Sequence, residues 1–211
     1  MMRMPPQKLY SLQKVAGVGM IEILVSLFVL TIGLLGVASL QFTGTFNNVQ
    51  AASRSQAELV ARYVSEQMVS AAQPAQTDDG WEVDDAFFNT DFFNFETLSC
   101  NDSNLYKCYC LTLPATIPNC RTGNCTSAEI AEYSGWEASC QAVGSNPNMR
   151  ISVSCNDRNN GDAKACSSGS LVNIAVSWPV KSDQQSTVAN DSRCTFNTDS
   201  NRACVIKEVT L

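Results

Sequence analysis

The sequence of 211 residues contains no histidine. This absence excludes Ser-His-Asp and Cys-His catalytic sets, because both need an imidazole as general base. It also excludes zinc sites that combine cysteine with histidine ligands. The sequence has neither a P-loop nor a G-x-G-x-x-G run that would hold a nucleotide phosphate. We therefore expect a protein that is not an enzyme and that uses no cofactor.

Cysteine is absent from the first 99 residues but frequent in the remainder of the chain. The ten cysteines are Cys100, Cys108, Cys110, Cys120, Cys125, Cys140, Cys155, Cys166, Cys194 and Cys204. This number is typical of a domain that folds in an oxidising compartment outside the cytoplasm. The partition therefore predicts a cysteine-free N-terminal arm followed by a domain held together by disulfides.

Metal binding is the alternative use of these cysteines. Cys108 and Cys110 are separated by one residue, and Cys120 and Cys125 by four, so neither pair forms a C-x-x-C knuckle. We therefore expect disulfides and no metal site. The sequence leaves the connectivity open. Short separations favour the pairs Cys155–Cys166 and Cys194–Cys204, with the other six cysteines in undetermined pairing.

Basic residues are in the minority, with 14 Lys and Arg against 20 Asp and Glu. This balance argues against a general nucleic-acid binder. Three of the basic residues, Arg3, Lys8 and Lys14, fall within the first 17 residues, which contain no acid. Under the positive-inside rule, this end of the chain stays in the cytoplasm.

An apolar run follows the basic end. Residues 23–40 form an 18-residue stretch without charge, just long enough to cross a bilayer as a helix. A secretory signal peptide is the alternative, but no A-x-A site closes the run. From Gln41 to Ala72 the sequence has no proline and only one glycine, Gly44. We therefore predict one helix over residues 18–72, with its membrane-spanning part over about 18–40.

Glu22 stands at the start of the apolar run, among Met20, Ile21, Ile23 and Leu24. An acidic side chain at the centre of a membrane helix costs roughly 2.5 kcal/mol or more on insertion scales. A buried carboxylate is tolerated when a cation accompanies it. The sequence near Glu22 offers no basic side chain for this purpose, so the counter-charge has to come from elsewhere.

The pattern of a basic leader ending in Gly17, then Val18-Gly19-Met20-Ile21-Glu22 and an apolar helix, resembles the class III signal of type IV pilins. The resemblance implies that a prepilin peptidase cuts after Gly17 and methylates the new terminus at Val18. Val18 departs from the Phe or Met usual in the family. The family precedent is that Glu22 meets the terminal amine of a neighbouring subunit.

Within the pilins, the PilV group of minor pilins, also called type IV pilus modification proteins, is the most similar. Its members read IEVLVALLVLAIGLLGLAGLQ where residues 21–41 read IEILVSLFVLTIGLLGVASLQ. Residues 53–71, SRSQAELVARYVSEQMVSA, and the stretch NIAVSWPVK at 173–181 also fit. Pro179 replaces the acid that usually follows the tryptophan in this family. The strong similarity covers about residues 10–72.

This resemblance implies a minor pilin that primes pilus assembly and is incorporated at or near the tip, supporting adhesion and twitching motility. The implied partners are other minor pilins, the major pilin, the inner-membrane assembly platform, the prepilin peptidase and a large tip adhesin. The implied location is the inner membrane with a periplasmic head, then the pilus at the cell surface. Two alternatives remain, a minor pseudopilin of a type II secretion system and a tip module that binds DNA or another ligand. Loss of residues 1–17 leaves 11 basic and 20 acidic residues, which argues against DNA capture.

Residues 73–105 read as a loop between helix and sheet, and residues 78–96 within it are rich in acids and aromatics. Phe87, Phe88, Phe92 and Phe93 are expected to form a satellite core under the helix rather than an exposed partner surface. No calcium motif supports ligation by these acids. Residues 156–162 begin like an EF-hand loop, but Gly161 is out of register and no closing Glu follows, so we predict a turn.

Residues 106–211 read as a disulfide-rich β-sheet head domain. Strands are expected over 106–113, 150–155, 171–178 and 203–211. Thr126 and Glu129 form a capping-box pattern, which predicts an inserted helix from there to about Ala142. The order of a long helix, a loop and an antiparallel sheet predicts an α+β, pilin-like fold.

Overall fold

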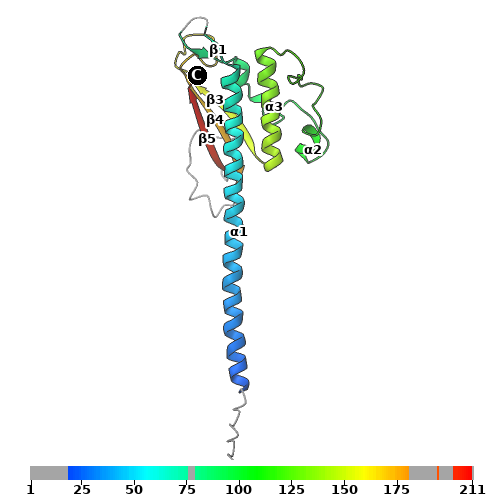
Figure 1. The fold of residues 1–211 in the computed structure, drawn as a ribbon, viewed down its shortest axis with the longest axis vertical. Coiled ribbons are helices and arrows are strands. Elements are labelled where there is room, and N and C mark those ends of the chain that lie inside the picture. The colour runs from blue at the N-terminus through cyan, green and yellow to red at the C-terminus, as the bar shows by residue number, and fades with distance from the viewer. Residues whose placement is uncertain (1–18, 76–78, 181–193, 195–201, 211) are drawn as a thin grey trace, which may run out of the picture. The chain divides into compact units, whose positions relative to one another are not determined.

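A computed structural model describes residues 19–75, 79–180, 194 and 202–210. Its principal elements are the helices α1 (Met20–Ala71), α2 (Leu105–Tyr109) and α3 (Ser127–Ser145) and the strands β3 (Arg150–Asn156), β4 (Leu171–Pro179) and β5 (Arg202–Thr210) (Figure 1). The chain divides into two compact units, Met1–Asn47 and Asn48–Leu211. The arrangement is α+β, with a long N-terminal apolar helix, a C-terminal antiparallel sheet and disulfides.

Helix α1 changes character along its length. None of its residues before Ala57 is buried, although the first half is the most apolar part of the chain. From Ala57 onward, α1 buries Ala57, Val60, Ala61, Val64 and Met68, whose spacing of three and four residues places them on one face. This face packs into the main core of the second unit.

The sheet has the order β3-β4-β5, and both pairings are antiparallel. Strand β4 is central, and seven of its nine residues are buried. Its alternate residues Val172, Ile174, Val176 and Trp178 join the same core as α1. Burial on both faces explains why this strand reads as a nearly continuous apolar run. The three strands lie within two residues of their expected bounds.

Helix α3 begins as its capping box predicts. The Thr126 hydroxyl accepts a hydrogen bond from the Glu129 backbone N–H at 3.3 Å, and the Glu129 carboxylate accepts one from the Thr126 N–H at 2.7 Å. The carboxylate bonds lower the pKa of Glu129. In Figure 1, α3 lies beside the C-terminal half of α1, and both helices contribute to the core that covers the sheet.

The strand expected over 106–113 is wrong, because the structure has the short helix α2 there. The Asn104 side chain caps this helix by accepting the Lys107 backbone N–H at 3.1 Å. Cys108 of this segment bonds to Cys100, and Cys110 bonds to Cys140, so the two disulfides connect the segment to different parts of the chain. Tyr109, between the two cysteines, is buried in a small core with Phe95 and Val143.

Residues 73–105 are more ordered than a plain loop. Strands β1 (Gln73–Pro74) and β2 (Trp81–Glu82) form a two-stranded antiparallel ribbon, followed by the 3₁₀ helices η1 (Asp85–Phe88) and η2 (Thr90–Phe92). Phe87 and Phe93 are each 2% exposed and belong to the main core. Phe88 and Phe92 are partly buried. Phe87, Phe88 and Phe93 therefore belong to the principal core or pack against it, and do not form a satellite core.

Candidate functional site

Glu22 lies in the first turn of α1 and is exposed. Its backbone N–H donates to the Gly19 carbonyl at 2.9 Å, and its own carbonyl accepts the Ser26 hydroxyl at 2.7 Å. Gly17 and Val18, the expected processing residues, lie outside the described part of the chain. The structure therefore fixes the backbone position of Glu22 at the start of the helix and leaves its carboxylate open to a partner.

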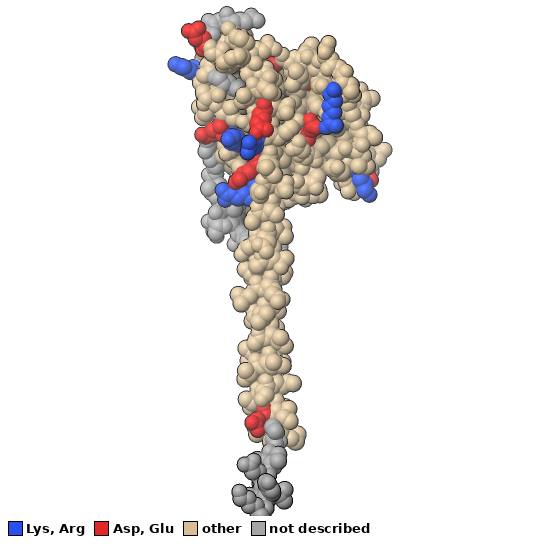
Figure 2. Space-filling model, viewed as in Figure 1, with Lys and Arg blue, Asp and Glu red and all other residues tan. Residues whose placement is uncertain are grey.

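The helix surface that follows Glu22 is uncharged as far as Ser53 and most apolar over residues 23–40. No charged residue occurs between Ile23 and Ser53, and Figure 2 shows this stretch almost entirely as uncharged residues. The hydroxyls of Ser26, Thr31, Thr43 and Thr45 all donate to carbonyls three or four residues earlier, at 2.7–3.1 Å. These hydroxyls are satisfied within the helix, as polar groups in lipid need to be. Helix α1 is long and apolar enough to cross a membrane.

The ten cysteines form five disulfides. The pairs are Cys100–Cys108, Cys110–Cys140, Cys120–Cys125, Cys155–Cys166 and Cys194–Cys204. The last two are the pairs that short separation favours. Cys110–Cys140 spans 30 residues and joins the segment after α2 to helix α3. Cys140, Cys155 and Cys204 lie in α3, β3 and β5, so three of the disulfides join a long helix or a strand to a connecting segment.

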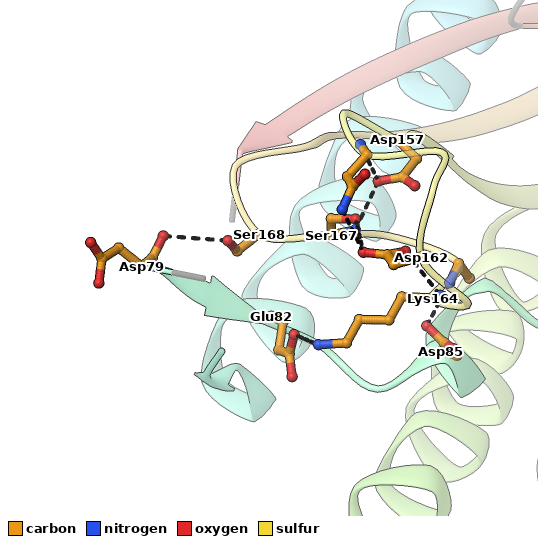
Figure 3. Close-up of polar contacts among 10 residues, drawn as sticks. Asp79, Glu82, Asp85, Asp157, Asp162, Lys164, Ser167 and Ser168 are labelled. Carbon is orange, nitrogen blue, oxygen red and sulfur yellow. Dashed lines mark hydrogen bonds and ion pairs between the residues drawn. The ribbon is translucent and has the colours of Figure 1, made fainter. Parts of the chain in front are cut away.

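The acidic segment 79–85 contacts the loop that Cys155–Cys166 closes. Glu82 and Lys164 form an ion pair, the Ala165 backbone N–H donates to Asp85 at 2.9 Å, and the Ser168 hydroxyl donates to the Asp79 carbonyl at 3.3 Å (Figure 3). The side chains of Glu82 and Asp85, which sequence alone leaves without a role, therefore hold two loops together.

Asp157 organises the loop after β3. Its Oδ1 accepts hydrogen bonds from the Ser167 backbone N–H at 2.9 Å, from the Ser170 hydroxyl at 3.0 Å and from the Asn159 N–H at 3.3 Å. These donors, the Ser167 N–H above all, lower the pKa of Asp157 to about 2. The contacts make a turn of the kind expected. Within residues 19–75, 79–180, 194 and 202–210, no three Asp, Glu, Cys or His side chains are placed to hold a metal ion.

Glu137 of α3 is the centre of a second polar cluster. Its Oε2 accepts the Tyr63 hydroxyl from α1 at 2.5 Å, and its Oε1 forms an ion pair with Arg121. Burial, followed by the bond to Glu137, raises the pKa of the Tyr63 hydroxyl. The bond to Glu137 also raises the pKa of Arg121, which lies inside the small loop closed by Cys120–Cys125. Sequence gives no sign of this cluster, because its members are far apart along the chain.

A groove with a volume of about 580 Å³ lies beside this cluster. One wall is the face of α3 that carries Tyr133, Glu137 and Gln141, and the other is the chain from Tyr106 to Arg121. Its lining combines aromatic rings with planar polar side chains. The sequence does not reveal this groove, because its second wall depends on α2 and on the Cys110–Cys140 bond.

Comparisons with the models of known protein families, with curated protein sequences and with solved structures find no match to this chain. The apolar helix, Glu22 and the disulfide-bonded unit are therefore the features from which we infer a function.

Proposed function

We propose that the protein is a minor pilin of the PilV type, which primes assembly of a type IV pilus and is incorporated at or near its tip. The observation that carries the proposal is the exposed helical stretch from Ile23 to Ser53, which has no charge and follows Glu22 directly. The disulfide-bonded α+β unit after it is the kind of domain expected on the periplasmic side. The similarity of residues 21–41 to the PilV group supplies the finer assignment.

Under this proposal, the Glu22 carboxylate is the partner of a terminal amine during assembly. Cleavage after Gly17 creates an amine at Val18, four residues before Glu22 and near the same face of the helix. The Glu22 carboxylate of one subunit pairs with the terminal amine of a neighbour in the filament. Pairing removes the cost of an isolated charge at membrane depth, roughly 2.5 kcal/mol on insertion scales, and so favours assembly. It also sets the axial register between adjacent helices.

The proposal places the protein first in the inner membrane, with its head in the periplasm, and then on the pilus. Its partners there are the prepilin peptidase, the assembly platform, the major pilin, other minor pilins and a tip adhesin. A minor pseudopilin of a type II secretion system would use the same N-terminal features. Neighbouring genes distinguish the two, since a pilin should be encoded among other minor pilins and a pseudopilin within a secretion operon.

Processing provides the direct test. The intact mass of protein purified from its native membrane should correspond to loss of residues 1–17, with one added methyl group on Val18. A matched Gly17→Ala sample should retain the full leader, because the resemblance assigns the cleavage to this glycine. A product cut after Leu40 would instead identify an ordinary secretory signal and would contradict the proposal.

A further inference from the structure

The groove beside α3 has the dimensions of a ligand site. Its volume of about 580 Å³ falls within the range of roughly 300–1,000 Å³ typical of small-molecule sites. Tyr133, Glu137, Gln141 and Gly144 are spaced four, four and three residues apart, so they line successive turns of one helix face. All the lining residues belong to the second unit.

The walls of the groove are fixed before any ligand arrives. The disulfide Cys110–Cys140 joins one wall directly to the other. The Trp136 indole N–H donates to the Tyr109 carbonyl at 2.9 Å, which holds this ring in a single orientation. A hydrogen bond from Tyr63 and an ion pair with Arg121 likewise fix the orientation of the Glu137 carboxylate. A site that is already ordered loses little conformational freedom on binding.

Gly144 allows one aromatic ring to lie close against α3. A Cβ at this position would stand 3.3 Å from Cε2 of Tyr106, which is closer than an ordinary contact. The Tyr106 ring therefore rests on the helix where the glycine leaves room, and the residue remains 43% exposed. Its outer surface is available to a ligand in the groove.

The polar lining indicates the chemistry of that ligand. Among the described residues, Arg121 and Glu137 are the only charged ones that line the groove, and they pair with each other, so their charges cancel. Asn119 and Gln141 add amide groups, which both donate and accept hydrogen bonds. Planar groups of this kind suit a neutral molecule with many hydroxyls, while an aromatic ring suits the flat C–H face of a sugar ring.

We propose that this groove binds a neutral saccharide, with a pyranose face on Tyr106 and hydroxyls hydrogen-bonded to Asn119 and Gln141. A peptide fits less well, because the groove is lined by a helix and connecting segments and by no strand edge that could pair with an extended backbone. The proposal concerns the second unit alone and does not depend on assembly into a pilus.

The test uses the full-length, oxidised chain in a polyoxyethylene detergent, because maltoside or glucoside headgroups would compete for the site. The probes are the methyl glycosides of glucose, galactose, mannose and N-acetylglucosamine, together with the corresponding trisaccharides. Saturation-transfer NMR reports contact with the sugar protons. Titration of the intrinsic tryptophan fluorescence, to which Trp136 in the groove contributes, gives the affinity. We expect saturable binding of at least one probe.

Variants connect binding to the groove. Tyr106→Ala should weaken the affinity by about tenfold. Trp81→Ala removes an exposed ring outside the groove and should change the affinity by less than about twofold. Gln141 is an exposed helix residue, so Gln141→Ala should fold normally. If Tyr106→Ala does not fold, the saccharide affinity of Gln141→Ala shows whether the groove is the binding site.

The proposal is overturned if no probe binds saturably, or if Tyr106→Ala and Gln141→Ala bind as well as the wild-type chain. Equal loss in Trp81→Ala would identify non-specific stacking and would overturn it too. Capture of unstructured peptides by the groove, in place of saccharides, would replace the proposed ligand class.

Discussion

The hydroxyl of Tyr63 in α1 donates a 2.5 Å hydrogen bond to Oε2 of Glu137 in α3. The two residues are 74 positions apart, and their bond links the two helices that cover the sheet. Arg121 binds the other carboxylate oxygen, so one side chain of α3 connects α1 with the loop closed by Cys120–Cys125. Loss of either partner would leave Glu137 partly buried without its full set of donors.

Tyr63→Phe should therefore lower the free energy of unfolding. A hydrogen bond to a charged acceptor contributes about 1.5–3 kcal/mol, and this one is partly buried, so we expect a loss of about 1.5 kcal/mol. Urea unfolding of the oxidised chain measures it. Tyr106→Phe is the matched control, since that residue is largely exposed, and its unfolding midpoint should be close to wild type. Equal midpoints for Tyr63→Phe and wild type would show that the bond adds nothing to stability.

The lowered pKa of Asp157 predicts that the folded chain loses stability as the pH falls. Its pKa in the folded chain is about 2, below the value of roughly 3.9 for an unperturbed aspartate. A lowered pKa means that the unfolded state takes up a proton first as the pH falls. The contribution of Asp157 is therefore complete above about pH 4 and is lost as the pH falls toward 2.

Thermal melts between pH 5 and pH 2 measure this effect in wild type and in Asp157→Asn. The variant should be less stable at pH 5 and should lose less stability than wild type on acidification. Gly135→Ala is the control, because it lowers stability by overlap with the Phe92 backbone and touches no carboxylate, so it should keep the wild-type slope. Parallel curves for wild type and Asp157→Asn would refute the role of Asp157.

Two glycines of α3 offer a matched pair of substitutions. A Cβ on Gly135 would lie 2.6 Å from the backbone carbonyl oxygen of Phe92, whereas a Cβ on Gly144 would meet only the Tyr106 ring at 3.3 Å. Alanine favours a helix over glycine by about 1 kcal/mol. At Gly135 the overlap with backbone outweighs this gain, so Gly135→Ala should destabilise the chain by about 1–3 kcal/mol.

At Gly144 the neighbouring ring is at the surface and can move. Gly144→Ala should therefore change the unfolding free energy by no more than about 1 kcal/mol in either direction. Chemical denaturation of both variants gives the comparison. If Gly135→Ala were as stable as Gly144→Ala, the close contact between α3 and η2 would not exist in solution.

Local sequence signals are sufficient for the regular elements. The uninterrupted apolar run and the absence of proline predict α1, the Thr126–Glu129 pattern predicts the start of α3, and β-branched residues predict β3, β4 and β5. In each case the signal lies within one element. The predicted strand over 106–113 is wrong because disulfides rather than periodicity determine the backbone there. The short elements within 73–105 likewise differ from the loop that the sequence predicts there.

The contacts that shape the candidate sites could not be predicted in this way. Asn94 has a φ of 58°, and its side-chain amide bonds with both the N–H and the carbonyl of Ile151, each at 2.8 Å. Phe95 follows with a φ of 63°, a conformation rare for a bulky residue. Like Tyr63 and Glu137, these residues meet partners far away in sequence. Such pairings depend on tertiary structure and leave no local pattern.

Glu22 provides the decisive test of the proposed assembly role. Glu22→Ala removes a charge from the membrane helix, so insertion should be unchanged or slightly easier. The disulfide-bonded unit should keep its five disulfides and its melting temperature, because Glu22 belongs to the first unit. Co-purification with partner pilins and the number of surface pili should both fall, because the Val18 amine loses its counter-charge.

Glu22→Gln separates charge from shape, because glutamine keeps the size and the hydrogen-bonding capacity of the side chain while removing its charge. If the pairing is electrostatic, Glu22→Gln should reduce piliation and partner capture as strongly as Glu22→Ala. Ser26→Ala is the control, since its hydroxyl bonds only to the helix backbone at 2.7 Å and carries no charge, and it should assemble normally. Wild-type piliation by Glu22→Gln would reject the electrostatic account and leave steric fit as the explanation for glutamate at this position.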